Sequence, residues 1–435
     1  MERFALSRMK EWKENENRKP LIIRGARQVG KTWIMKTFGQ QYFEKTAYVN
    51  FDNNARMKQV FEGDLDIERL VLSISAETGV SIEAENTLII FDEVQEVPKA
   101  LTSLKYFYEN APQYAIVAAG SLLGVALHQG TSFPVGKVDF LDLYPLNFRE
   151  FLCAMGEKQF VSMLDSCDTQ MVTVFKTKYI ERLREYYFVG GMPEVVKDFS
   201  EKKDYNRVRA IQKNLINYYQ QDFSKHAEIK LVPRLNLVWN SIPMQLAKEN
   251  KKYIYGQVRE GSRAKDFELS IQWLLDCGLI HKVQRIQKPD LPLKAYIDFD
   301  AFKLFLVDIG LLIAMTDLDA KVIIEGNKIF TEFKGALTEQ YILQQLISDV
   351  GVIPYYYSTQ NSKGEIDFLV QGKTSVIPIE VKAEENLKAK SLKAFCEKYQ
   401  PSYAVRTSMS DYREQDWMTN IPLYAIKWIE NYVNQ

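Results

Sequence analysis

Eight residues near the start of the chain combine glycines, a lysine and a hydroxyl group in a fixed order. They are Gly25, Ala26, Arg27, Gln28, Val29, Gly30, Lys31 and Thr32. This spacing is typical of a phosphate-binding loop, or P-loop, in which backbone N–H groups surround the phosphates. The lysine of such a loop reaches the β- and γ-phosphates, and the hydroxyl group binds Mg²⁺. We therefore expect all eight residues to bind ATP, Lys31 to be catalytic as well, and Thr32 to bind Mg²⁺.

An acidic pair, Asp92 and Glu93, directly follows the apolar run 88–91. This pattern is typical of the Walker B motif that accompanies a P-loop on a later strand of the same sheet. Asp92 is expected to orient Mg²⁺ through a water molecule, and Glu93 is expected to act as the catalytic base that polarises the attacking water. The alternative for Glu93 is a solvated residue at a strand end.

A further small polar residue, Ser121, follows the apolar run 115–119 and Gly120. A side chain at this strand end can sense the γ-phosphate, which makes Ser121 a catalytic candidate; a turn residue is the alternative. No arginine finger is assigned. Arg149 is the most suggestive basic residue, but a surface ion pair is its expected role.

Three carboxylates and a lysine near the C-terminus form a second candidate site. Glu339 lies in a helical stretch, Asp367 begins an apolar strand, and Glu380 is followed two residues later by Lys382. Residues two apart in a strand point the same way, and a hairpin brings Asp367 beside them. Carboxylate oxygens suit Mg²⁺, which gives Glu339, Asp367 and Glu380 as metal ligands and Asp367, Glu380 and Lys382 as catalytic residues for phosphodiester attack. Ordinary charges on an exposed strand edge are the alternative.

Short apolar runs must position the first site. Runs at 21–24, 47–51, 87–91 and 115–119 alternate with helix-length stretches, which predicts a parallel sheet buried on both faces. Residues 150–248 have helical periodicity. Around 190–194 a Gly-Gly-Met-Pro-Glu stretch marks the end of one helix and the start of the next.

In residues 237–299 the order of predicted elements is different. Two helices, 237–249 and 263–277, are followed by two strands, 279–286 and 293–299. Helix, helix, hairpin is the order of a winged helix-turn-helix, which often reads DNA. Eight basic and four acidic residues lie between 251 and 288, a modest footprint for phosphate contacts. A packing module without nucleic acid is the alternative. Helices near 335–346 and 388–399 and strands at 353–358, 366–370 and 375–381 predict a last α/β unit.

The composition sets limits on the partners. The 435 residues exceed one hydrophobic core, and 56 basic residues balance 56 acidic ones, so no global field draws the chain to nucleic acid or membrane. The cysteines, Cys153, Cys167, Cys277 and Cys396, lack metal-site spacing and are expected to be buried thiols in a reducing compartment. No apolar stretch is long enough to span a bilayer. We expect a cytoplasmic protein.

The chain resembles the predicted bacterial and archaeal AAA+ ATPases that end in a restriction-endonuclease-like domain of uncharacterised function. The resemblance is carried by the segments 24–32, 91–95, 119–121, 144–151 and 190–194. It implies an α/β fold with an AAA+ ATPase core at 1–150, a helical lid at 151–235, a winged helix-turn-helix at 236–310 and a restriction-endonuclease-like α/β domain at 311–435. The C-terminal residues resemble the PD-(D/E)XK signature, with Asp367, Glu380 and Lys382 in its core roles and Glu339 as the helical acid.

Two functions follow as hypotheses. The first is a Mg²⁺-dependent ATPase that acts on DNA and whose nuclease-like domain cleaves phosphodiester bonds. The second is an ATP-dependent switch whose C-terminal domain binds DNA or a protein without cleaving. DNA is the expected partner, and a homo-oligomer or a protein partner is compatible with either hypothesis.

Overall fold

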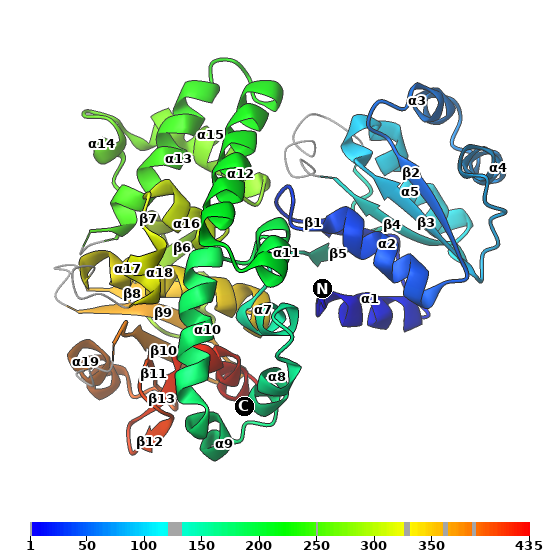
Figure 1. Cartoon of the computed structure of the whole chain (residues 1–435). Coiled ribbons are helices and arrows are strands. Elements are labelled where there is room, and N and C mark those ends of the chain that lie inside the picture. The colour runs from blue at the N-terminus through cyan, green and yellow to red at the C-terminus, as the bar shows by residue number, and fades with distance from the viewer. Residues whose placement is uncertain (1, 121–132, 249–250, 326–330, 360–363, 385–388) are drawn as a thin grey trace. The chain divides into compact units, whose positions relative to one another are not determined.

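The computed structural model describes residues 2–435 except 121–132, 249–250, 326–330, 360–363 and 385–388. The chain divides into two compact units. The N-terminal unit comprises Glu2–Tyr144 and Asp276–Leu279, and the C-terminal unit comprises Pro145–Leu275 and Ile280–Gln435. Figure 1 shows their elements. The predicted domain boundaries stay predictions.

The N-terminal unit is built on a parallel sheet, as predicted. Within the described residues the sheet has five strands in the order β2-β3-β4-β1-β5. Four of them match the apolar runs of the sequence, with β2 beginning earlier than expected, and the short strand β5 was not predicted. The strands are β1 Leu21–Arg24, β2 Lys45–Asn50, β3 Thr87–Asp92, β4 Ala115–Ala119 and β5 Asp139–Asp142.

Helices cover both faces of this sheet (Figure 1). Side chains of β3 that alternate along the strand, Ile89 and Phe91, join the apolar core with α3, α4 and α5. Helix α2 packs against β2, β3 and β4, and α1 packs against α2 through Trp12 and Phe38. Because helices cover both faces, the neighbouring strands β3 and β4 are buried along their whole length. The helices are α1 Ala5–Glu14, α2 Lys31–Tyr42, α3 Ala55–Glu62, α4 Ile67–Thr78, the 3₁₀ turn η1 Val94–Glu96 and α5 Pro98–Asn110.

The predicted helical region is confirmed in the C-terminal unit. Asn147 begins it with a capping box, in which its side chain accepts from the Glu150 N–H and the Glu150 carboxylate accepts from the Asn147 N–H. The helices are α7 Phe148–Ala154, α8 Lys158–Asp165, α9 Thr169–Val174, α10 Lys176–Val189, α11 Pro193–Lys202, α12 Tyr205–His226, α13 Val232–Leu246, α14 Tyr255–Val258 and α15 Ala264–Asp276.

The glycine pair between α10 and α11 allows close backbone packing. Gly191 N–H donates to the buried Asp308 carboxylate over 2.6 Å, and Gly191 carbonyl oxygen accepts from the Leu146 N–H over 2.7 Å. A Cβ at Gly191 would lie 2.1 Å from the Leu146 carbonyl oxygen. Glycine is therefore required here by the approach of another backbone. Pro193 then supplies the first residue of α11.

A mixed sheet forms the rest of the C-terminal unit. In the described part of the chain it has eight strands in the order β12-β13-β11-β10-β9-β8-β6-β7. The hairpin β6–β7, which the sequence assigned to a separate winged helix, pairs with β8 and so extends this sheet. The strands are β6 Ile280–Ile286, β7 Ile297–Leu306, β8 Tyr355–Ser358, β9 Glu365–Gln371, β10 Val376–Val381, β11 Val405–Ser408, β12 Arg413–Gln415 and β13 Met418–Pro422.

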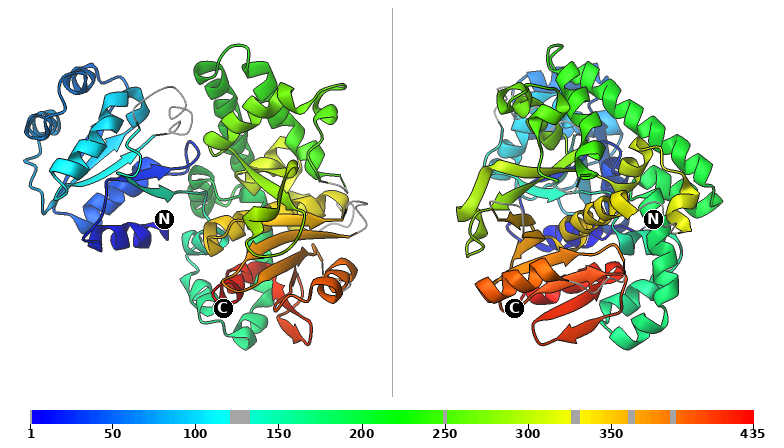
Figure 2. Two further views of the ribbon diagram at one scale, coloured as in Figure 1. Left: turned by 180° about the vertical axis from the view of Figure 1, so that it is seen from behind. Right: turned by 90° about the vertical axis from the view of Figure 1, so that its left-hand side faces the viewer.

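Helices α18 and α19 lie on opposite faces of this sheet (Figures 1 and 2). The prediction of a strand at 293–299 is wrong for its first half, because Leu293–Tyr296 form the 3₁₀ turn η2 before β7. The remaining elements are α16 Ile309–Met315, α17 Ala320–Ile324, α18 Thr331–Gln345, the π-helical turn η4 Leu346–Val350, α19 Lys390–Tyr399, the 3₁₀ segment η5 Leu423–Ile429 and α20 Glu430–Val433.

The sequence also led to predictions about membrane-spanning segments and about the cysteines. Among the described residues no helix is both long and apolar enough to cross a membrane. The four cysteines form no disulfide, and only Cys277 is buried, while Cys167 is exposed. The expectation of uniformly buried thiols is therefore wrong.

Candidate functional site

The P-loop lies between β1 and α2, at the carboxyl end of its strand. Gly25 and Gly30 have φ angles of 147° and 95°, which favour glycine. A Cβ at Gly25 would also lie 2.1 Å from the Leu143 carbonyl oxygen. The loop leads into the first turn of α2, where backbone N–H groups and the helix dipole favour a bound anion. The sequence therefore forms the local geometry that phosphate binding requires.

Lys31 is buried against its own loop. Its ammonium group donates to the carbonyl oxygens of Gly25 and Ala26, both over 2.9 Å. Burial lowers the pKa of Lys31 to about 8, and the positive charge of Arg27 acts in the same direction. The negative charges of Glu93 and Asp92 oppose this shift. Without a bound anion, the Lys31 ammonium group therefore loses its proton at a lower pH than an ordinary lysine does.

Thr32 and Asp92 are adjacent although they come from different parts of the chain. Thr32 Oγ1 donates to Asp92 Oδ2 over 2.7 Å. Asp92 ends β3 and is buried. A hydroxyl oxygen and a carboxylate oxygen side by side are the hard donors that suit Mg²⁺. The residues that the sequence assigned to the metal of the ATP site are therefore brought together.

A tyrosine that sequence reasoning missed shares this carboxylate. The Tyr48 hydroxyl donates to Asp92 Oδ2 over 2.9 Å, and the Lys36 ammonium lies 3.7 Å from the centroid of the Tyr48 ring. Burial raises the pKa of Tyr48, and the charge of Asp92 raises it further. Tyr48 is on β2, which pairs with β3. Only the pairing of the two strands identifies Tyr48 as a neighbour of Asp92, because no sequence pattern distinguishes it from other tyrosines in strands.

Glu93 lies just beyond β3 in a backbone conformation that is rare for a non-glycine residue, with φ of 50°. Its N–H donates to Asp92 Oδ1 over 3.1 Å, and its carboxylate accepts from Gln95 Nε2 over 2.7 Å. Outliers of this kind concentrate at functional sites. Ser121, the predicted γ-phosphate sensor, lies outside the described residues.

The pKa of Lys31 gives a test in solution. Bound phosphates stabilise the ammonium form, so above pH 8 ATP binding requires proton uptake and the Kd for ATP should rise about tenfold per pH unit. Calorimetric titrations with Mg²⁺-ATP between pH 7 and pH 10 measure this rise, and buffers of different ionisation enthalpy report the proton taken up. A Kd that stays constant to pH 10 would contradict the assigned phosphate contact.

The C-terminal carboxylates lie within the other unit and contact lysines. Lys251 forms an ion pair with Glu339, and the buried Lys303 on β7 contacts both Glu339, at 3.6 Å, and Glu365. Asp367 Oδ2 accepts from the Val381 N–H over 2.7 Å, and Glu339 is close enough to Asp367 for its charge to raise the pKa of Asp367. Neither lysine was among the predicted site residues.

Charges within this group nearly cancel. Burial raises the pKa of Asp367 to about 7, and the charge of Glu339 adds to that shift. The pKa of Glu339 is lowered, since the charges of Lys251 and Lys303 outweigh the effect of burial. The ammonium groups of both lysines therefore offset the carboxylate charge that would otherwise attract a divalent cation.

Glu380 and Lys382 form a separate pair. Lys382 Nζ lies 2.6 Å from Glu380 Oε1, and Glu380 Oε2 accepts from the Leu392 N–H at the start of α19 over 3.1 Å. The side chains of this pair are thus adjacent, as the spacing predicted. Among the described residues, however, no three acidic, histidine or cysteine side chains are grouped closely enough to hold one metal ion. The shared metal site of Glu339, Asp367 and Glu380 stays a prediction without support from this arrangement.

Arg149 is part of the framework of the C-terminal unit. Its guanidinium group donates to Asp349 through Nε and Nη2 and also contacts Asp165. The expected ion pair is confirmed, but Arg149 and Asp349 are largely buried rather than at the surface.

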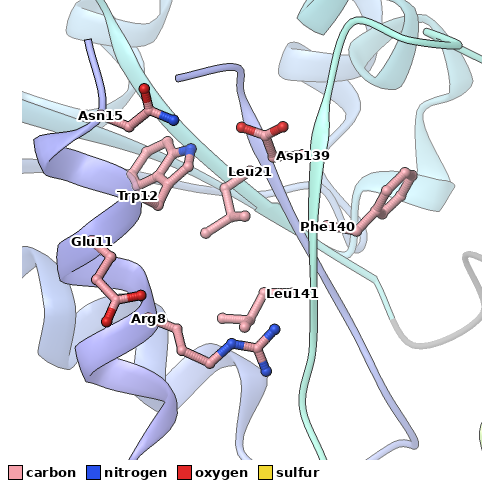
Figure 3. Close-up of a pocket in the computed structure, with 8 residues that line it drawn as sticks. All are labelled: Arg8, Glu11, Trp12, Asn15, Leu21, Asp139, Phe140 and Leu141. Carbon is pink, nitrogen blue, oxygen red and sulfur yellow. The ribbon is translucent and has the colours of Figure 1, made fainter. Parts of the chain in front are cut away.

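A pocket of about 390 Å³ in the N-terminal unit is separate from the P-loop (Figure 3). It includes Leu21 and Asp139, the first residues of β1 and β5, together with Trp12 from α1. Ligands of parallel sheets bind beyond the carboxyl ends of the strands, and these residues are at the opposite ends. This pocket has no part in the ATP site.

Comparisons with protein families assign three parts of the chain. Residues 17–152 match a family described as an AAA domain. Residues 180–322 match a domain of unknown function (DUF8612), and residues 334–426 match another domain of unknown function (DUF4143). No curated protein sequence matches the chain.

Three solved structures show distant similarity to this chain. A Walker-type ATPase of Pyrococcus abyssi is 15% identical, with a TM-score of 0.44 over 72% of this chain and 95% of that one. The Orc1 protein of Aeropyrum pernix, in complex with DNA, is 13% identical, with a TM-score of 0.27 over 72% and 91%. Cdc6p of Pyrobaculum aerophilum is 10% identical, with a TM-score of 0.26 over 74% and 93%. At such TM-scores these similarities carry no argument. The family match and the P-loop geometry together identify the N-terminal part of the chain as an AAA domain.

Proposed function

We propose that this protein is a Mg²⁺-dependent ATPase that acts on DNA. The observation that carries the ATPase proposal is the 2.7 Å hydrogen bond between Thr32 Oγ1 and Asp92 Oδ2. It supports a metal site between the P-loop and the end of β3, since both oxygens suit Mg²⁺. When bound, Mg²⁺ would neutralise phosphate charge.

The residues around this site have distinct roles in the proposal. The P-loop N–H groups and Lys31 bind the phosphates, and Asp92 is oriented by Tyr48. Glu93 takes a proton from the attacking water. Its fixed backbone and its hydrogen bond from Gln95 support this role, because a general base must be held in place. Ser121 remains a proposed γ-phosphate sensor.

Action on DNA is supported by the basic residues of 251–288 and by the order helix, helix, hairpin. We propose a winged helix-turn-helix at 236–310 and a restriction-endonuclease-like fold at 311–435, joined through the pairing of β6 with β8. ATP turnover by the full chain is expected to rise when duplex or single-stranded DNA is added. Unchanged turnover at every salt concentration would favour the alternative, a switch that controls a protein partner.

The second function, DNA cleavage, rests on the proximity of Glu339 and Asp367 and of Glu380 and Lys382. The buried Lys303 weighs against it, because its charge and that of Lys251 together offset the charge of Glu339. We therefore propose that the C-terminal unit binds DNA without cutting it.

A cleavage assay separates these alternatives. Linear, circular and single-stranded DNA are incubated with Mg²⁺ or Mn²⁺, with and without ATP, and the protein is compared with Asp367→Ala. We expect no cleavage that depends on Asp367. Cleavage that is lost in the variant would instead establish a nuclease and overturn the non-cleaving assignment.

A further inference from the structure

A second pocket, in the C-terminal unit, has the chemistry of an anion-binding site. It has a volume of about 460 Å³ and lies between the ends of β6 and β8 and the end of α19. Among the described residues that line it are Arg285 and Lys398, and none is acidic. The volume is within the range of sites for small ligands. No residue of this pocket belongs to either candidate site described above.

The arginine is held in position by a partner outside the pocket lining. Arg285 Nε donates to Asp298 Oδ2 over 2.9 Å, and Nη2 contacts the same oxygen. This leaves Nη1 as a donor without a partner among the described residues. A guanidinium group that is fixed at one edge presents its other edge to a ligand, and phosphate oxygens match that edge.

Hydroxyl groups complete the donors. The Tyr357 and Tyr399 hydroxyls lie 2.8 Å apart, so one proton is used between them and one remains to donate. Burial raises the pKa of Tyr357 to about 12. Thr359 Oγ1 is buried without a hydrogen-bond partner in the described part of the chain. A buried hydroxyl without a partner is costly, and a bound oxyanion would satisfy it.

From these observations we infer that the pocket binds a phosphate group of a nucleic-acid strand. The inference rests on the proposed action on DNA. Ser358, in the pocket, pairs across the ladder with Glu365, which also contacts Lys303. The pocket is therefore next, in the sheet, to the Glu365 residue that forms an ion pair with Lys303. Lys398 is exposed at the pocket rim, so an extended strand can reach it.

The test is the salt dependence of DNA binding by the full chain. Fluorescence anisotropy with a labelled duplex and a labelled single strand is measured for the wild type, Lys398→Ala and the control Lys393→Ala, another exposed lysine of α19. Lys398→Ala is expected to weaken binding about three- to tenfold and to reduce the slope of log K against log salt by about one. Lys393→Ala should change neither. Tyr399→Phe, which keeps the ring, should weaken binding without changing the slope.

The outcomes separate the two proposals. If the wild type binds no DNA at low salt, the proposed action on DNA fails and the pocket assignment fails with it. If the wild type binds DNA and Lys398→Ala binds with the same affinity and slope, only the pocket assignment is overturned. Inorganic phosphate and a labelled mononucleotide serve as further probes. Lys398-dependent binding of either probe without DNA binding would identify a site for small phosphates and overturn the nucleic-acid assignment.

Discussion

Replacement of Glu93 by Gln is expected to lower kcat for ATP at least a hundredfold while the Kd for ATP stays within a few-fold. General-base catalysis typically contributes a factor of about 10² to 10⁴, and glutamine keeps the size and polarity of the side chain but does not accept the proton. The N–H of residue 93 still donates to Asp92, so the metal site should keep its geometry. Single-turnover hydrolysis and calorimetric ATP titration measure the two quantities separately.

The matched control is Glu96→Gln. Glu96 is exposed in the 3₁₀ turn that follows Glu93 and contains the same functional group. The Glu96→Gln substitution should leave kcat unchanged. If Glu93→Gln hydrolyses ATP as fast as the wild type, Glu93 is a strand-end residue rather than the base. If Glu93→Gln also fails to bind ATP, the side chain supports the structure of the site.

Replacement of Lys303 by Met should destabilise the C-terminal unit by about 3 to 5 kcal/mol, because removal of one partner leaves buried charge uncompensated. The Lys303 side chain is almost fully buried and contacts Glu339 and Glu365. Without its charge the pKa values of Glu339 and Asp367 rise in the folded state, because the charge of Lys303 lowers both of them. When folding raises the pKa of a carboxyl group, the free energy of unfolding falls as the pH increases through that range. The destabilisation by Lys303→Met should therefore be greater at pH 8 than at pH 5.

Urea unfolding at both pH values measures this difference. Lys373→Met serves as the control, since Lys373 is exposed in the turn between β9 and β10. The free energy of unfolding of the Lys373→Met variant should differ from that of the wild type by less than about 0.5 kcal/mol. Equal stability of Lys303→Met and the wild type would show that Lys303 is not the counter-ion of the cluster. Lys303 would then not compete with a metal ion for Glu339 and Asp367.

The geometry of the candidate ATP site was largely predictable because its parts are local. Gly25 to Thr32 are contiguous, and Asp92 and Glu93 directly follow their strand, so the spacing of residue types already contains the geometry. Tyr48 was not predictable in this way. Its contact with Asp92 depends on the pairing of β2 with β3. The sequence of neither strand indicates which strand will be its neighbour.

The C-terminal unit depends on contacts between distant parts of the chain, and the sequence interpretation is weaker there. The spacing of Glu380 and Lys382 predicted their proximity correctly. Lys251 and Lys303 come from other segments, and without a structure neither can be assigned to Glu339. Similarly, the hairpin β6–β7 has a local signal, but its pairing with β8 has none. Long-range charge compensation is thus the feature that changes the functional interpretation.

The most direct measurement is steady-state ATP hydrolysis by the full chain with Mg²⁺, with the metal chelated, and in Lys31→Ala. We expect turnover that requires Mg²⁺ and falls to the rate without protein in the variant, because Lys31 is the P-loop cation that binds the phosphates. Folding of the variant is checked by its unfolding midpoint. Turnover by Lys31→Ala equal to that of the wild type, or no turnover and no ATP binding by the wild type at any Mg²⁺ concentration, would contradict the proposed ATPase.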